Sequence, residues 1–321
     1  MVTRFIIYLM ALHTTCLTAN AGIGDTLKYI ETPVSFKVND ITIYGTLTIP
    51  AQSSKPMPVS IIIPGSGHTD QDGNNMAAGL HNDAYKQLAH ALAGANIASL
   101  RYNKRIISQK KAVQPVNRPL TFDTEVEDAK TLIHYLKQDT RFSHLIVIGH
   151  SLGALVGTLA ASGGADKFIS ICGLGFKGDE TLKKQLSAQP AIVLEKAEPI
   201  IDSLARGFAV NEVPSLIDPL FNKSLQPFLM SWFKYDPAVE LSKIIIPSLV
   251  IQGSQDIQVT TADAQKLTSL SPKTKLVIIN NMNHVFKIVS GGREENLASY
   301  SNPALPLSMQ LVNEIVTFIR Q

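Results

Sequence analysis

The sequence predicts an α/β fold in which helices cover both faces of a mainly parallel sheet. Short apolar runs, typical of strands buried on both faces, alternate with segments of helical periodicity. The strand-like runs are 59–63, 97–102, 145–148, 168–172, 249–252 and 276–279. The helical patterns are 85–93, 126–137, 152–161, 262–270 and 307–319. In such a fold ligands bind at the carboxyl ends of the strands.

An antiparallel hairpin is expected before this alternating region. Apolar and polar residues alternate over 34–38 and again over 41–49, and the intervening Asn39-Asp40 pair is typical of a turn. Because a hairpin of this kind adds two antiparallel strands to the parallel ones, we expect it at the edge of the sheet.

One long interval, 176–241, lacks any buried-strand pattern. It contains helix-like stretches interrupted repeatedly by proline. An insertion of this size between two strands predicts a mostly helical cap over the active site. The expected organisation is therefore a signal peptide (1–21), a first core segment (22–175), the cap (176–241) and a second core segment (242–321).

The first 21 residues resemble a secretory signal peptide. Arg4 supplies a positive charge, residues 5–12 are mostly apolar, and Ala19-Asn20-Ala21 fits a small-x-small cleavage site. The apolar stretch is far shorter than the ~20 residues that cross a bilayer. We expect an exported protein, periplasmic or secreted, without stable membrane insertion after cleavage. Cleavage would leave Cys172 as the only cysteine, which excludes an intramolecular disulfide.

The composition is that of a globular protein, with 45% hydrophobic and 17% charged residues. A formal net charge of +3 gives no reason to expect a nucleic acid as partner. The densest basic stretch contains a single aromatic residue, so we expect a solvated loop there rather than a phosphate-binding patch. Its charged residues are Arg101, Lys104, Arg105, Lys110 and Lys111.

The strongest chemical motif is Gly149-His150-Ser151-Leu152-Gly153. It follows a predicted buried strand and opens a predicted helix, as a G-x-S-x-G nucleophile elbow requires. The tight turn leaves no room for side chains at the glycines and lifts the serine hydroxyl clear of the sheet. We therefore expect Ser151 to be a catalytic nucleophile.

A neutral serine needs a base that a carboxylate holds in one tautomer. Asp256 follows the predicted strand 249–252 and its Gly253, and His284 lies beyond the last predicted strand. This order, serine then acid then histidine, predicts Asp256 as the acid and His284 as the base. Asp236 is a competing acid, although an Asp before Pro237 commonly caps a helix.

Acyl transfer also needs hydrogen-bond donors for the tetrahedral oxyanion. The elbow supplies the backbone N–H of Leu152. The second donor should come from the loop after 59–63, where Pro64-Gly65-Ser66-Gly67 allows a close backbone approach. We expect the N–H of Ser66 in this role, with Gly67 as the alternative.

Four segments together resemble a known group of enzymes: 63–74 (IPGSGHTDQDGN), 101–105 (RYNKR), 149–153 (GHSLG) and 235–238 (YDPA). They are similar to secreted or periplasmic bacterial α/β-hydrolases that include the EstD-like carboxylesterases and are often grouped with serine aminopeptidases. The chain departs from the usual pattern at His68 and Gln71, where members carry Pro and Arg. The resemblance covers most of the mature chain and implies the α/β-hydrolase fold.

The resemblance also implies that short to medium acyl esters are hydrolysed through an acyl-enzyme, with a small-molecule ester as substrate and no cofactor. No metal is expected, because the calcium-loop-like segment 70–73 has its glycine too early and lacks the terminal Glu. A serine peptidase or amidase with the same triad remains an alternative. A peptidase that recognises a free amine would need a carboxylate pair in the cap, where Glu195, Glu198, Asp202, Glu212 and Asp218 are available. A non-catalytic exported binding protein is a third reading. The oligomeric state is not predicted.

An aromatic cluster in the expected cap supports two interpretations. It contains the single tryptophan of the chain and consists of Phe228, Leu229, Met230, Trp232 and Phe233. These side chains either pack the cap on the core or line an acyl pocket.

Overall fold

The computed structural model describes residues 28–39, 41–52, 56–108 and 119–321. The predicted signal peptide, residues 1–21, lies outside these ranges, so export stays a prediction. Within the ranges, none of the helices has both the length and the apolar character needed to span a bilayer.

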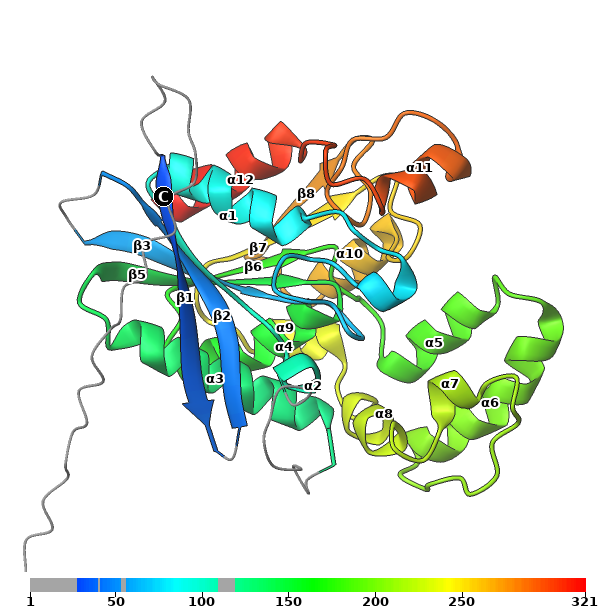
Figure 1. Cartoon of the computed structure of the whole chain (residues 1–321). Coiled ribbons are helices and arrows are strands. Elements are labelled where there is room, and N and C mark those ends of the chain that lie inside the picture. The colour runs from blue at the N-terminus through cyan, green and yellow to red at the C-terminus, as the bar shows by residue number, and fades with distance from the viewer. Residues whose placement is uncertain (1–27, 40, 53–55, 109–118) are drawn as a thin grey trace, which may run out of the picture.

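A single eight-stranded sheet forms the centre of the described chain, with strand order β1-β2-β4-β3-β5-β6-β7-β8 (Figure 1). Strands β1 and β2 form the predicted antiparallel hairpin, and β2 also pairs antiparallel with β4. All further neighbours are parallel. The mainly parallel sheet with a hairpin at its edge is therefore confirmed. The strands are β1 (Tyr29–Val38), β2 (Ile41–Pro50), β3 (Met57–Ile63), β4 (Ala98–Tyr102), β5 (Phe142–His150), β6 (Lys167–Ile171), β7 (Ser248–Gly253) and β8 (Lys275–Ile279).

Helices cover both faces of this sheet because successive side chains of a strand point to opposite sides. In β5, Ile146 and Ile148 join the apolar cluster that contains α1 (Ala84–Gly94) and α12 (Met309–Arg320). Leu145 and Val147 join the other cluster, with α3 (Phe122–Lys137), α4 (Leu152–Ala160) and α10 (Thr261–Thr268). Figure 1 shows α1 and α12 above the sheet and α3 and α4 below it.

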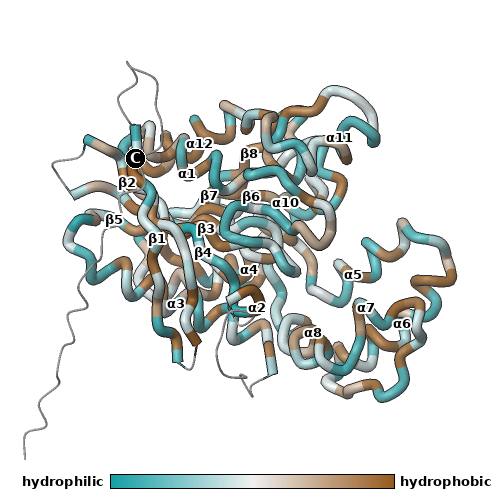
Figure 2. The backbone as a smooth tube through the Cα atoms, viewed as in Figure 1, coloured by the Kyte–Doolittle hydropathy of each residue, from teal (hydrophilic) through white to brown (hydrophobic). Residues whose placement is uncertain are grey.

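The interval after β6 forms helices, and four of them make a group at one side of the sheet (Figure 1). Within this group α6 packs against α5 and α8, and α8 packs against α3 of the core. Hydrophobic stretches run along α6 and α7 (Figure 2). The four helices are α5 (Gly178–Leu186), α6 (Ala191–Ala205), α7 (Asp218–Phe221) and α8 (Gln226–Trp232).

The end of the predicted cap differs from the rest. Helix α9 (Pro237–Ser242) packs against α4 and α10, which belong to the core. The separate helical group therefore ends before residue 237, whereas the sequence placed the boundary at 241. Proline interruptions do not reveal this boundary, because Pro237 begins a helix as readily as it ends one.

Two short helices have no counterpart in the sequence pattern. Helix α2 (Arg105–Ser108) follows β4, and α11 (Arg293–Ser299) follows β8. Single 3₁₀ turns form at Met76–Ala78 and Ala161–Gly163. Elements of one or two turns bury too few side chains to show a helical period.

The prediction of a solvated loop for the basic stretch that begins at Arg101 is wrong for the described part of that stretch, which starts within β4. Arg101, Lys104 and Arg105 are only 2%, 4% and 5% exposed. A buried cation is costly unless it is paired, and each has a carboxylate partner in a distant segment. The pairs are Arg101 with Glu31 and Asp72, Lys104 with Glu125, and Arg105 with Asp128. Lys110 and Lys111 lie outside the described residues.

The buried pair of Arg105 and Asp128 yields a stability prediction. Arg105 Nε donates to Asp128 Oδ2 at 3.0 Å, and both side chains are almost fully buried. Asp128→Ala removes a buried carboxylate that neutralises this guanidinium and should lower the free energy of unfolding by about 3–5 kcal/mol. The double variant Arg105→Met/Asp128→Leu removes both charges and should recover most of this loss. Urea denaturation of the three proteins measures both effects; a double variant as unstable as the single one would contradict the expectation.

Candidate active site

The loop from β5 into α4 has the backbone geometry of a strained strand–turn–helix connection. Ser151 adopts φ +54° and ψ −126°, a conformation that non-glycine residues rarely occupy. Its N–H donates to the carbonyl of Ile171 in β6 at 3.0 Å, which ties the turn to the neighbouring strand. A Cβ at Gly149 would lie 2.4 Å from the Gly153 carbonyl oxygen, and one at Gly153 would lie 2.4 Å from that of Ile63. The two glycines therefore permit a close contact between backbone segments that any side chain at these positions would prevent.

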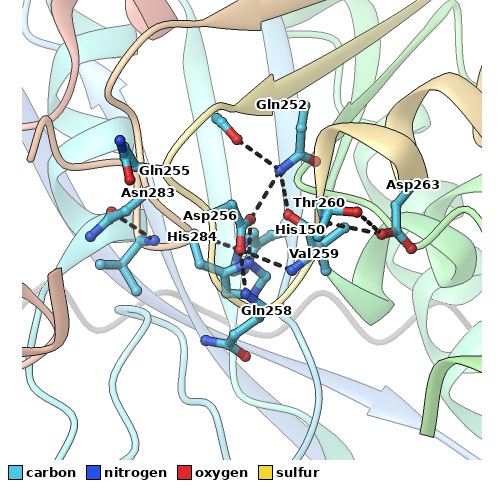
Figure 3. Close-up of polar contacts among 12 residues, drawn as sticks. His150, Gln252, Gln255, Asp256, Gln258, Val259, Thr260, Asp263, Asn283 and His284 are labelled. Atoms are coloured by element: carbon cyan, nitrogen blue, oxygen red, sulfur yellow. Dashed lines mark hydrogen bonds and ion pairs between the residues drawn. The ribbon is translucent and has the colours of Figure 1, made fainter. Parts of the chain in front are cut away.

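The predicted acid and base lie together at the carboxyl end of the sheet. The Nδ1 atom of His284 is 2.7 Å from Oδ2 of Asp256 (Figure 3), and the two side chains are 6% and 0% exposed. Because a carboxylate only accepts hydrogen bonds, Nδ1 of His284 carries the proton and Nε2 is left with a lone pair. This is the tautomer that a general base next to a serine requires.

Asp256 is held by four hydrogen bonds (Figure 3). Its Oδ1 accepts from the backbone N–H groups of Gln258 at 2.8 Å and Val259 at 2.9 Å, and its Oδ2 accepts from His284 and from the Gln252 side chain at 3.1 Å. Burial acts to raise the pKa of this carboxyl, but the charge and hydrogen bond of His284 and the N–H groups of Val259 and Gln258 outweigh it and hold the pKa below its usual value. The anionic form is thereby favoured.

Asp236, the competing acid, has a different place. Its Oδ1 accepts from the N–H groups of Ala238 and Val239 at the start of α9. This is an N-cap, as its position before Pro237 suggested. Of the two candidates it is Asp256 that binds His284.

The loop that carries His284 is fixed by the neighbouring Asn283, a residue that no sequence motif indicated. Asn283 is fully buried, and its Oδ1 accepts from the N–H groups of Val285 at 3.2 Å and Lys287 at 3.0 Å. Its Nδ2 donates to Asn296 and Ser299 of α11 at 3.1 and 2.6 Å. The unpredicted helix α11 therefore anchors the histidine loop.

His150, the variable residue of the elbow, connects this loop with the loop after β3. Its Nε2 is 3.0 Å from the His284 carbonyl oxygen and its Nδ1 is 2.6 Å from the Tyr85 hydroxyl. Since a carbonyl only accepts, Nε2 carries the proton. Burial, together with the neighbouring His284, lowers the pKa of His150 far below its usual value and favours the neutral ring. Tyr85 therefore donates to Nδ1 and accepts from the Gly65 N–H at 3.1 Å.

The predicted oxyanion residues lie on two adjoining backbone segments. Leu152 is the first residue of α4, where an N–H has no acceptor within its own helix. The loop after β3 approaches from the other side, since a Cβ at Gly65 would lie 3.2 Å from Ser151 Cβ. Ser66 follows Gly65 and is exposed, and Gly67 adopts φ +67°. Within the described residues the hydroxyl of Ser151 has no hydrogen-bond partner. In unliganded enzymes the hydrogen bond between a catalytic serine and its base commonly tightens only on substrate binding.

Two residues of the predicted triad form, together with Cys172, a group with the composition of a metal site. Ligand atoms of Cys172, Asp256 and His284 lie within 4.8 Å of one another. The Asp256 and His284 atoms already bind each other, and burial raises the pKa of the Cys172 thiol, whereas a metal would need the thiolate. The arrangement therefore fits acid–base chemistry better than metal binding.

A family model described as "Alpha/beta hydrolase family" matches residues 61–289, a span from β3 to the histidine loop. The chain belongs to the alpha/beta hydrolase family. It is 30% identical over 290 residues to Esterase EstD of Thermotoga maritima, an alignment that covers 85% of this chain and 65% of EstD. The chain thus spans somewhat less than two thirds of that relative. The resemblance to the EstD-like group is confirmed.

Solved structures of this alpha/beta hydrolase fold include Est1E from Butyrivibrio proteoclasticus, with a TM-score of 0.57, 14% identity and coverage of 90% of this chain and 99% of Est1E. The Pyrococcus furiosus esterase Pf2001 matches with a TM-score of 0.54 and 13% identity over 93% of this chain and 96% of its own. At these identities the likeness establishes the shared fold.

The two candidate acids give a direct test of the site. Asp256→Asn should lower hydrolytic turnover by about 10⁴ while the protein stays folded, because an amide favours the wrong imidazole tautomer. Asp236→Asn should retain most activity, since Asn caps helices as well as Asp does. Steady-state kinetics and circular dichroism of both variants check this. An inactive Asp236→Asn beside a near-normal Asp256→Asn would reverse the assignment.

Proposed function

We propose that the protein is a serine carboxylesterase that hydrolyses esters of short to medium acyl chains through an acyl-enzyme intermediate. Ser151 is the nucleophile, His284 the general base and Asp256 the acid that orients the base. The observation that carries the proposal is the buried Asp256–His284 hydrogen bond of 2.7 Å, in a loop that is bonded to His150, the residue before a serine held at positive φ. The 30% identity to an esterase supports an ester as substrate.

The proposed reaction begins when Ser151 Oγ attacks the ester carbonyl carbon and transfers its proton to His284 Nε2. The N–H groups of Leu152 and Ser66, with Gly67 as the alternative to Ser66, bind the oxygen that becomes negative. Collapse of this intermediate breaks the ester C–O bond, and the alkoxide takes the proton from His284. Water then attacks the acyl-enzyme by the same steps and releases the carboxylic acid.

Two contacts bear on the choice between ester and peptide. In the helical group after β6, Glu198 and Asp202 both contact Lys183, and their side chains are 53% and 52% exposed. Carboxylates neutralised at an exposed surface are poorly placed to bind the free amine of a peptide. This disfavours Glu198 and Asp202 as the carboxylate pair that an aminopeptidase would need.

The nucleophile is tested by Ser151→Ala. The variant should fold normally, and its kcat for esters should fall on the order of 10⁶-fold, as in the best-studied triads of this type. Turnover of p-nitrophenyl esters of graded chain length measures this loss. Comparison with an aminoacyl p-nitroanilide shows whether the protein prefers an ester or an amide bond. A fluorophosphonate probe should label Ser151 in the parent protein and nothing in the variant. Labelling of another residue, or a loss below about tenfold, would refute the assignment.

The aromatic cluster of α8 gives a second test, of chain length. Trp232 is 6% exposed, and its Nε1 has no hydrogen-bond partner within the described residues. A Cβ at Gly178 would lie 2.7 Å from its ring, so one face packs on the start of α5. If another part lines the acyl site, Trp232→Ala should change the relative rates on acetyl and octanoyl esters. A lower melting temperature with unchanged relative rates would assign the residue to packing alone.

A further inference from the structure

Both backbone polar groups of Gly65 are bound by buried side chains. Its N–H donates to the Tyr85 hydroxyl at 3.1 Å, and its carbonyl oxygen accepts from Lys104 Nζ at 2.7 Å. Tyr85 belongs to α1, whereas Lys104 follows β4, and both are nearly inaccessible to solvent. Gly65 therefore fixes the loop after β3 through hydrogen bonds to two separate parts of the chain.

The contact with Lys104 fixes more than the carbonyl. The carbonyl of Gly65 and the N–H of Ser66 belong to one planar trans peptide group, so they point in opposite directions. An ammonium that holds the oxygen therefore also sets the direction of the N–H. Its positive charge draws electron density toward the oxygen, which makes the N–H of Ser66 a stronger donor.

We propose that Lys104 is a positioning residue of the oxyanion hole, which aims and polarises the Ser66 N–H through the Gly65 carbonyl. This inference rests on the proposed function, because it takes Ser66 as the second oxyanion donor. Lys104 acts through the peptide group and touches neither the nucleophile nor the substrate. Gly65 lies close to Ser151, so a small rotation of the Gly65–Ser66 peptide changes the distance between the Ser66 N–H and the oxyanion.

Glu125 of α3 completes the arrangement. Its carboxylate lies 3.6 Å from Lys104 Nζ, and it is 8% exposed. Burial lowers the pKa of Lys104 from its usual value, and Glu125 opposes this by favouring the ammonium. Burial also raises the pKa of Glu125, and Lys104 opposes that shift, so each charge favours the other. The ammonium of this pair lies 2.7 Å from the Gly65 carbonyl oxygen.

The test compares Lys104→Met with the double variant Lys104→Met/Glu125→Gln. Methionine keeps a stem of similar length but removes the donor and the charge. Both variants should lower kcat/KM on p-nitrophenyl butyrate by about 10- to 100-fold, somewhat less than removal of an oxyanion donor. A trifluoromethyl ketone, whose adduct with serine carries an oxyanion, should bind more weakly by a similar factor. Recovery of activity in the double variant would overturn the proposal, because the defect would then come from the unpaired Glu125.

The matched control is Arg105→Met/Asp128→Leu, which removes the adjacent buried ion pair without touching Gly65. It should keep kcat/KM within about threefold of the parent, even if its melting temperature falls. Equal losses in the control and in the Lys104 variants would show that any disturbance of this region slows the enzyme, and would overturn the positioning role. Folding of all variants is checked by circular dichroism.

Fluorophosphonate labelling separates this inference from the esterase proposal. The reaction of the probe with Ser151 also develops charge on an oxygen in the oxyanion hole, but it requires no particular ester. If the parent labels at Ser151 yet hydrolyses no ester, a slower rate constant for labelling in Lys104→Met would still support the positioning role. A rate constant equal to that of the parent would refute it. If the parent does not label at Ser151, both proposals fail together.

Discussion

The contact between the backbone of the β5–α4 turn and the end of β3 is the constraint on which the site depends. Gly149 and Gly153 lie so close to neighbouring carbonyl groups that any side chain there would collide with main chain. This approach brings the loop after β3 against Ser151, and it accompanies the rare positive φ of that serine. Strain of this kind persists only where the surrounding packing enforces it, and it is common at functional sites.

Polar groups then hold the three loops that meet at this turn. His150 bonds the carbonyl of His284 on one side and Tyr85 on the other, and Tyr85 bonds Gly65. The chain of hydrogen bonds runs from the loop after β3 to the histidine loop through the elbow itself. Since each group is buried, losing one partner would leave its neighbour unsatisfied, so the three loops are coupled.

Buried charged residues also help to hold the loop after β3. Three basic residues, one within β4 and two directly after it, are buried, and each is paired with a carboxylate from another segment. Such pairs are weak evidence for stability, because desolvation offsets most of their attraction. The pair of Lys104 with Glu125 has a geometric role, because Lys104 reaches the carbonyl of Gly65.

The sequence by itself determined the mainly parallel sheet, the hairpin at its edge and the positions of Ser151, Asp256 and His284 at the ends of strands, because buried strands and glycine turns leave local patterns. Only the tertiary structure decided which side chains meet there. The basic run 101–105 has the composition of a solvated loop, and its burial depends on acids such as Glu125 and Asp128 from another helix. Likewise, α9 packs with the core and Asn283 bonds α11 through contacts between distant segments. Local composition carries no record of such contacts, since pairing across the fold sets the cost of burying a charge or an amide.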